Sequence, residues 1–330
     1  MLSGRLWPAH PKPLQDELLS SWIVRIARAN GLKLQTFCDR VFGKERQLWN
    51  RDIDRLAPNW LLAALARHTG TLPDAVRRTT LDVYRDRLFH QSKSSGQLRW
   101  ILSMGVYHRT RRYFGMQFCP RCLTEDEEPY FRTRWRVAAL TFCPEHKLHL
   151  HDRCPSCGAP IVFHRRELGQ PEVTDSGPLC LCHACDFDLR NAQCKPFVPY
   201  EASITTELAM LANYIAGLGD ILNIGRMDVL YQLCKVMIGA RKSSNLTAFV
   251  MGTIGSEDYA LSHGRRAFES RPIEERSHII QLGVWLLANP QECIPAAWRA
   301  KAVRYNHLVK DFLSMPAWYS SIVRPLNRRY

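Results

Sequence analysis

Apolar residues recur every three to four positions over most of the chain, which is the spacing of amphipathic helices. The first such stretch covers residues 18–27 and stops at Asn30-Gly31, and a shorter one covers residues 34–42. The last third of the chain repeats this pattern. Helices are expected there near residues 208–218, 229–237, 274–288 and 295–312. The patterning predicts a mainly α protein.

A helix, a small-residue turn and a second helix follow one another in the N-terminal part. The first helix is expected over residues 60–68, the turn at Thr69-Gly70 and the second helix over residues 72–85. This arrangement is a helix-turn-helix, whose second helix can enter the major groove of DNA. An ordinary αα-hairpin with a solvated basic face has the same pattern, so the sequence leaves both interpretations open.

The start of the second helix carries signals of its own. Thr71 and Asp74 have the spacing of a capping box, and Pro73 falls in the first turn, where its missing N–H costs no hydrogen bond. These residues predict a well-defined helix start directly after the turn.

The chain carries 45 Lys and Arg residues against 31 Asp and Glu residues, a formal net charge of +14. An excess of this size favours a polyanionic partner, above all nucleic acid, although a solvated basic surface gives the same count. Some candidate arginines surround the helix-turn-helix, and others alternate with aromatic residues near position 110, where a strand with alternating faces is an equally good interpretation. The candidates for nucleic-acid contact are Arg67, Arg77, Arg78, Arg85, Arg109, Arg111 and Arg112.

Eight metal-ligand residues stand in four pairs, each with two residues between its members. The pairs are Cys119 and Cys122, Cys143 and His146, Cys154 and Cys157, and Cys182 and Cys185. Each pair can sit on a tight turn that aims both ligand atoms at one ion, so four pairs suit two tetrahedral zinc sites. Because four protein ligands fill each site, the sites are expected to be structural and not catalytic.

The metal assignment leaves some choices open. Sequential pairing places the first two pairs on one ion, whereas an interleaved arrangement of the first and third pairs fits the same spacing. Cys180 competes with Cys182, which is preferred because it has the two-residue spacing to Cys185. Disulfides are the alternative to metal, but no apolar secretory segment precedes the cysteines, and a reducing cytosol keeps thiols free.

These patterns predict four segments along the chain. They are an N-terminal helical domain with the helix-turn-helix over residues 1–92, a basic and aromatic connector over 93–115, a tandem zinc-binding module with short β-strands over 116–197, and a C-terminal helical domain over 198–330. No phosphate-binding glycine loop, nucleophile elbow or zinc-protease motif occurs, and no apolar run reaches the about 18 residues of a membrane span. We therefore expect a cytoplasmic, nucleoid-associated protein without enzymatic activity.

Further residues accompany these motifs in a particular order. They are Pro13, the run Asp16 to Trp22, Arg25, Ala27 and Gly31 near the start, and Phe118, Trp135, Leu150, Gly158 and the run Asp186 to Leu189 among the metal-ligand pairs. Together with the four pairs, they resemble the TniQ/TnsD family of transposon proteins over residues 1–195. One departure is Asp186, which follows the last cysteine where the family often has glycine.

This resemblance implies a role in choosing the target site of a cut-and-paste transposon. It implies two structural Zn²⁺ ions on the eight ligand residues, an N-terminal helix-turn-helix, and partners that include target DNA and an AAA+ ATPase regulator of the TnsC type. Longer TnsD-like relatives read an attachment sequence themselves, whereas shorter TniQ-like relatives sit on a CRISPR RNA-guided effector. We therefore expect a homodimeric, non-enzymatic adaptor, with a sequence-specific DNA-binding protein as the alternative.

Overall fold

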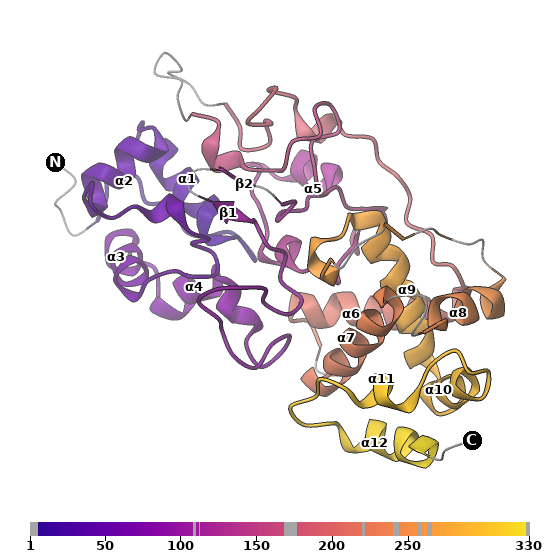
Figure 1. The fold of residues 1–330 in the computed structure, drawn as a ribbon. Helices are drawn as coiled ribbons and strands as arrows, with labels where there is room; N and C mark the ends of the chain where they lie inside the picture. Colours follow the sequence, from indigo (N-terminus) through magenta and orange to yellow (C-terminus); the bar gives the residue numbers. More distant parts are fainter. Residues whose placement is uncertain are drawn as a thin grey trace. The chain divides into compact units, whose positions relative to one another are not determined.

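The computed structural model describes residues 6–107, 110–111, 113–167, 177–219, 222–239, 244–255, 259, 261–262 and 266–327. It is mostly helical, as the hydrophobic pattern predicts (Figure 1). The α-helices are α1 (Leu19–Ala29), α2 (Leu34–Phe42), α3 (Asn59–Thr69), α4 (Pro73–Arg78), α5 (Pro120–Glu125), α6 (Thr205–Ala216), α7 (Ile224–Ile238), α8 (Leu246–Ile254), α9 (Ile273–Ala288), α10 (Pro290–Arg299), α11 (Tyr305–Val309) and α12 (Ala317–Val323).

The described strands are only two residues long. They are β1 (Val106–Tyr107), β2 (Thr110–Arg111), β3 (Phe142–Cys143) and β4 (Leu148–His149). β1 pairs with β2 in antiparallel register, with Val106 opposite Arg111. The fold class predicted from the sequence, a mainly α chain with short strands near the metal-ligand pairs, is confirmed.

The chain divides into two compact units. The first comprises Met1–Arg85, Gln91–Val137 and Leu148–Lys195, and the second comprises Asp86–His90, Ala138–Lys147 and Pro196–Tyr330. Among the described residues, no helix is both long and apolar enough to span a membrane.

Helix α1 forms the centre of the first unit. Leu19, Trp22, Ile23 and Ile26 have no exposed surface, as expected for a helix with an apolar stripe facing a core. Aromatic rings close this core beside α2: the ring of Trp7 packs edge-on against Phe37, with 5.1 Å between centroids. The helices predicted over 18–27 and 34–42 are therefore both present, and both help to build one core.

The helix-turn-helix consists of α3 and α4, which pack against each other. Gly70 ends α3 in the left-handed conformation with φ of +61°, and its N–H bonds to the carbonyl of Ala66, so a residue without a Cβ is favoured at this turn. Pro73 is the first residue of α4, as predicted. The capping box is wrong: Leu72 occupies the N-cap without a side-chain bond, and the Thr71 hydroxyl bonds to that of Thr69.

Helix α4 is also shorter than predicted, because it ends at Arg78 and not at Arg85. The hydroxyls of Thr79 and Thr80 donate to the carbonyls one turn back, at 2.7 and 2.8 Å, which competes with helix continuation. The Thr79 carbonyl in turn accepts the N–H of Leu19 at 2.8 Å. A 3₁₀ turn over Leu81–Tyr84 follows.

Helix α9 forms the centre of the second unit, in contact with α6, α7, α8 and α10 (Figure 1). Thirteen of its sixteen residues are buried, which is typical of a helix surrounded by others. The helix predicted over 295–312 is wrong. Its residues belong to α10, which begins at Pro290, and to α11, because Lys301 adopts a positive φ of +57° and ends the helical run.

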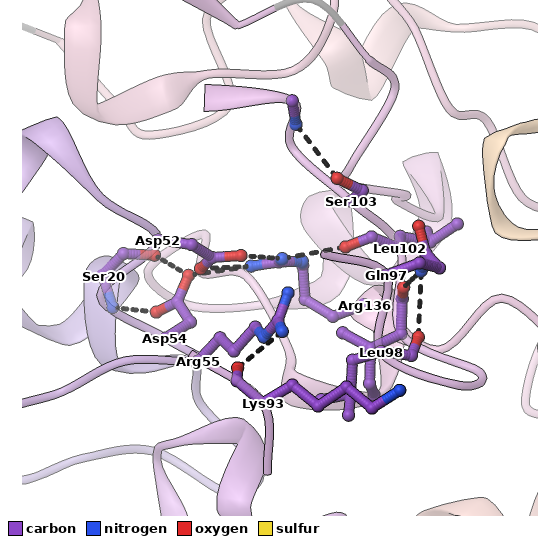
Figure 2. Close-up of polar contacts among 12 residues, drawn as sticks. Ser20, Asp52, Asp54, Arg55, Lys93, Gln97, Leu98, Leu102, Ser103 and Arg136 are labelled. Carbon is purple, nitrogen blue, oxygen red and sulfur yellow. Dashed lines mark hydrogen bonds and ion pairs between the residues drawn. The ribbon is translucent and has the colours of Figure 1, made fainter. Parts of the chain in front are cut away.

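A buried ion cluster holds the first unit together (Figure 2). The guanidinium of Arg136, which has no exposed surface, donates to both carboxylate oxygens of Asp52, to Asp54 and to the carbonyl of Leu102. Asp54 also accepts the N–H and the hydroxyl of Ser20 at 2.8 and 3.0 Å. This cluster joins the start of α1 to the segment after η1 (Leu48–Asn50), to η3 (Thr133–Arg136) and to the segment before β1.

Candidate metal centres and basic surface

The first group of ligand residues is Cys119, Cys122, Cys143 and His146. Their ligand atoms all lie within 4.8 Å of one another. Cys119 precedes α5 and Cys122 lies in its first turn, while Cys143 ends β3. The three thiols are buried, and His146 presents Nδ1 to the Cys143 sulfur at 3.4 Å.

The second group is Cys154, Cys157, Cys182 and Cys185, again with all ligand atoms within 4.8 Å. Here the sulfurs of Cys154 and Cys185 lie 3.7 Å apart, and so do those of Cys157 and Cys182. Cys157 and Cys185 are exposed, in contrast to the first group. Of the two pairings that the spacing allows, the structure has the sequential one, and Cys182 stands in the group in place of Cys180.

Three of the four pairs are closed by the same backbone turn. Lys147, Gly158 and Asp186 each follow the second ligand of a pair and adopt φ of +53°, +71° and +57°. The N–H of each donates to the carbonyl of the first ligand, at 2.8 to 3.0 Å. Only glycine takes this conformation without strain. The exposed side chain of Asp186 forms an ion pair with Arg166, with Nε 2.9 Å from Oδ1.

Two thiols of the second group have pKa values shifted in opposite directions. Burial raises the pKa of Cys182 to about 12, whereas the backbone N–H of Phe187 lowers the pKa of Cys185 to about 7. A metal binds the thiolate form, so metal binding to this group must release protons.

The donor sets and distances of both groups fit zinc. With Zn–S bonds of about 2.3 Å, a tetrahedral site has sulfur–sulfur edges of about 3.8 Å, close to the 3.7 Å edges of the second group. The first group offers three sulfurs and one nitrogen, and the second four sulfurs, both typical of structural zinc. The two groups could therefore each hold a metal ion.

The candidate nucleic-acid residues fall into three kinds. Arg67, Arg77 and Arg78 are exposed around the turn of the helix-turn-helix and make no ion pair with any described residue. Arg85 is instead bound to Asp82, with its Nε 2.9 Å from Oδ1. Arg109 and Arg112 lie outside the described residues, and of Arg111 only the backbone, in β2, is described.

Two groups of polar residues outside the predicted site residues belong to no recognisable sequence motif. The buried Glu17 accepts from Arg25 at 2.8 Å, and burial raises the pKa of Glu17 to about 7 although Arg25 opposes the shift. The second group is an exposed basic loop with Lys44, Arg46 and Arg51. A run of cations marks this loop in the sequence, but the acids interspersed with it hide the charge excess.

Comparison with known families identifies the N-terminal part of the chain. Residues 8–150 match the TniQ family, a stretch that contains α1 to α4 and all four ligands of the first group. The chain thus carries a TniQ domain over these residues. The assignment links it to target selection in DNA transposition. No curated protein matches the chain.

Proposed function

We propose that this protein is a non-enzymatic target-selection adaptor of a transposon, which links a complex bound to the target DNA to an AAA+ regulator of transposition. The TniQ domain over residues 8–150 is the observation that carries the proposal. The absence of a nucleotide-binding or hydrolytic motif in the sequence agrees with an adaptor role.

The partners follow from the same family resemblance. The regulator is an ATPase of the TnsC type, and the protein acts as a homodimer. The target complex is a CRISPR RNA-guided effector or another DNA-bound assembly. In this role the adaptor needs rigid surfaces for two partners, and the two compact units provide a scaffold of that kind.

The metal groups serve this role as structural elements. Cys119, Cys122, Cys143 and His146 hold one Zn²⁺ ion, and Cys154, Cys157, Cys182 and Cys185 hold another. Such ions supply folding free energy to segments whose own core is thin. The strands here are two residues long, so the backbone around each group relies on its side-chain ligands for order.

A second candidate function is direct reading of DNA sequence. The exposed guanidinium groups of Arg67, Arg77 and Arg78 around the helix-turn-helix favour it, since arginine is the commonest reader of guanine in the major groove. The short α4 limits it. With six residues, the helix spans only about 9 Å at 1.5 Å per residue, and Arg77 and Arg78 sit at its C-terminal end.

Selection from a random-sequence duplex pool separates the two functions. The protein is incubated with the pool at two salt concentrations, and the bound fraction is sequenced. Binding without an enriched motif, lost steeply as salt rises, supports the adaptor, because charge alone then holds the DNA. An enriched motif that survives the higher salt contradicts it and establishes a direct reader, and Arg77→Ala should then relax specificity at one position.

A further inference from the structure

The loop between α2 and α3 runs past both ends of the helix-turn-helix. Near its start, the guanidinium of Arg46 lies over the ring of Trp60, 4.4 Å from the centroid, at the beginning of α3. Near its end, the Asp54 carbonyl accepts the N–H of Leu81 at 2.8 Å, just beyond α4. We call residues 43–53 the basic loop.

The basic loop is anchored from inside and is not a loose excursion. Leu48 and Ile53 are buried at 4% and 2% exposure, and Trp49 stacks on His164 with 4.7 Å between ring centroids. Apolar anchors of this kind hold the backbone in place. The side chains of Lys44, Arg46 and Arg51 then remain on the exposed face.

The acids that would neutralise this face are turned inward. Asp52 and Asp54 both bind the buried Arg136, at 2.6 and 3.1 Å (Figure 2). Glu45 is the one acid exposed in the basic loop. Lys44 and Arg51 form no ion pair within the described part of the chain. Three exposed cations therefore stand against one exposed carboxylate, although the sequence of this segment is nearly balanced.

We propose that the basic loop is a second DNA contact of the helix-turn-helix, which binds the phosphate backbone of the duplex beside it. The cations are spread along an exposed loop and converge on no pocket, which suits phosphates and not base edges. Arg46 is held over the ring of Trp60, so it loses less side-chain entropy on binding a phosphate. The inference rests on the proposed function and deepens it, because it gives the adaptor a charge-based contact of its own with the target DNA.

The test is the affinity of the whole protein for a 30-base-pair duplex across a salt series. One variant combines Lys44→Ala, Arg46→Ala and Arg51→Ala. Its control combines Arg299→Ala, Arg304→Ala and Lys310→Ala, which removes the same charge from exposed positions of the second unit. The loop variant should bind at least about ten-fold more weakly at low salt, and the slope of log K against log salt should shrink by about 3, at 0.9 per lost phosphate contact.

The loss should be the same on unrelated duplex sequences, and the control should keep both affinity and slope. Equal losses in the two variants would overturn the proposal, because net charge alone would then explain them. Unchanged duplex binding by the loop variant would also overturn it, including the case in which binding to single-stranded RNA is lost instead. Recruitment of the AAA+ regulator is measured in parallel, so that the adaptor role is judged separately. A loop variant that keeps both normal DNA affinity and normal recruitment of the regulator refutes the inference and leaves the adaptor function intact.

Discussion

The guanidinium of Arg136 meets the carboxylate of Asp52 end on, with Nη1 3.2 Å from Oδ1 and Nη2 2.6 Å from Oδ2. The two residues are 84 positions apart in the sequence. Their pairing fixes the end of the basic loop to the segment that precedes the second metal-ligand pair, and it removes an acid from the surface beside the helix-turn-helix. Stability and surface charge thus depend on the same bond.

Arg136→Ala should therefore destabilise the first unit strongly. It leaves Asp54, at 1% exposure, without its cationic partner, and removing one member of a buried ion pair costs about 3–5 kcal/mol. Arg85→Ala is the matched control, since its pair with Asp82 is exposed and is worth about 0–1 kcal/mol. Urea unfolding of both variants measures the difference. Equal midpoints would contradict the structural role of the Arg136 cluster.

Glu17 should make the stability of the first unit depend on pH near neutrality. Its pKa is raised from 4.5 to about 7 by burial, so between these values the folded state keeps a proton that the unfolded state has lost. The contribution of Glu17 to the free energy of unfolding is therefore largest at the low-pH end of this window. It falls as pH rises, by about 2 kcal/mol from about pH 5.5 to about pH 8.

The variant Glu17→Gln removes this titration and keeps an acceptor for the Ser21 hydroxyl. The difference in unfolding free energy between wild type and variant is compared at the two pH values, which cancels any effect of metal release common to both. The difference should change with pH in the stated direction. A constant difference would mean that Glu17 titrates at its ordinary pKa in the folded protein.

Gly158→Ala tests the turn that closes the metal-ligand pairs. Glycine stands there at φ of +71°, and a Cβ would meet no atom within 4 Å, so the substitution adds strain without a clash. It should cost about 1 kcal/mol and weaken zinc retention by the second group only. Gly96→Ala, also at positive φ and open space, is the control. Zinc loss in the control equal to that of the variant would refute the role of the turn.

The two metal groups should differ in how readily they lose zinc. A competing chelator should remove one equivalent early, from the group whose Cys157 and Cys185 are exposed, and the second more slowly. Zinc release is followed by absorbance of the chelator complex, with Cys157→Ser as the variant that lacks the early phase. Release of both equivalents at one rate would show that exposure does not govern access to the metal.

Loss of a buried ligand should have a larger effect. Cys143→Ser removes a thiol at 1% exposure from the first group, and structural zinc supplies on the order of 10–16 kcal/mol of apparent binding free energy. We expect the variant to bind one zinc ion and to lose the fold around that group. A well-folded Cys143→Ser protein with two zinc ions would contradict the ligand assignment.

Local signals explain what the sequence could predict. Residues within a few positions of one another determine the first helix of the helix-turn-helix, its end at Gly70 and the four ligand pairs. These features can therefore be predicted from residue spacing alone. The early end of α4 depends on tertiary bonds, since Thr79 gives its carbonyl to Leu19, which lies 60 positions earlier. Helix propensity alone could not indicate that stop.

The basic loop shows the same limit for the candidate surface. In the sequence, Lys44, Arg46 and Arg51 alternate with acids and suggest an ordinary solvated segment. Only the distant Arg136 reveals that Asp52 and Asp54 face inward. The pairing of Arg85 with Asp82 has the opposite effect, because it engages one of the arginines that the charge pattern favoured for DNA.

Recruitment of the AAA+ regulator to target DNA tests the central claim most directly. The regulator of the same transposon is incubated with DNA carrying the bound target complex, with and without this protein, and its retention on the DNA is measured. We predict that retention requires the protein and that the protein alone leaves the DNA uncut. Equal retention with and without the protein would contradict the adaptor function.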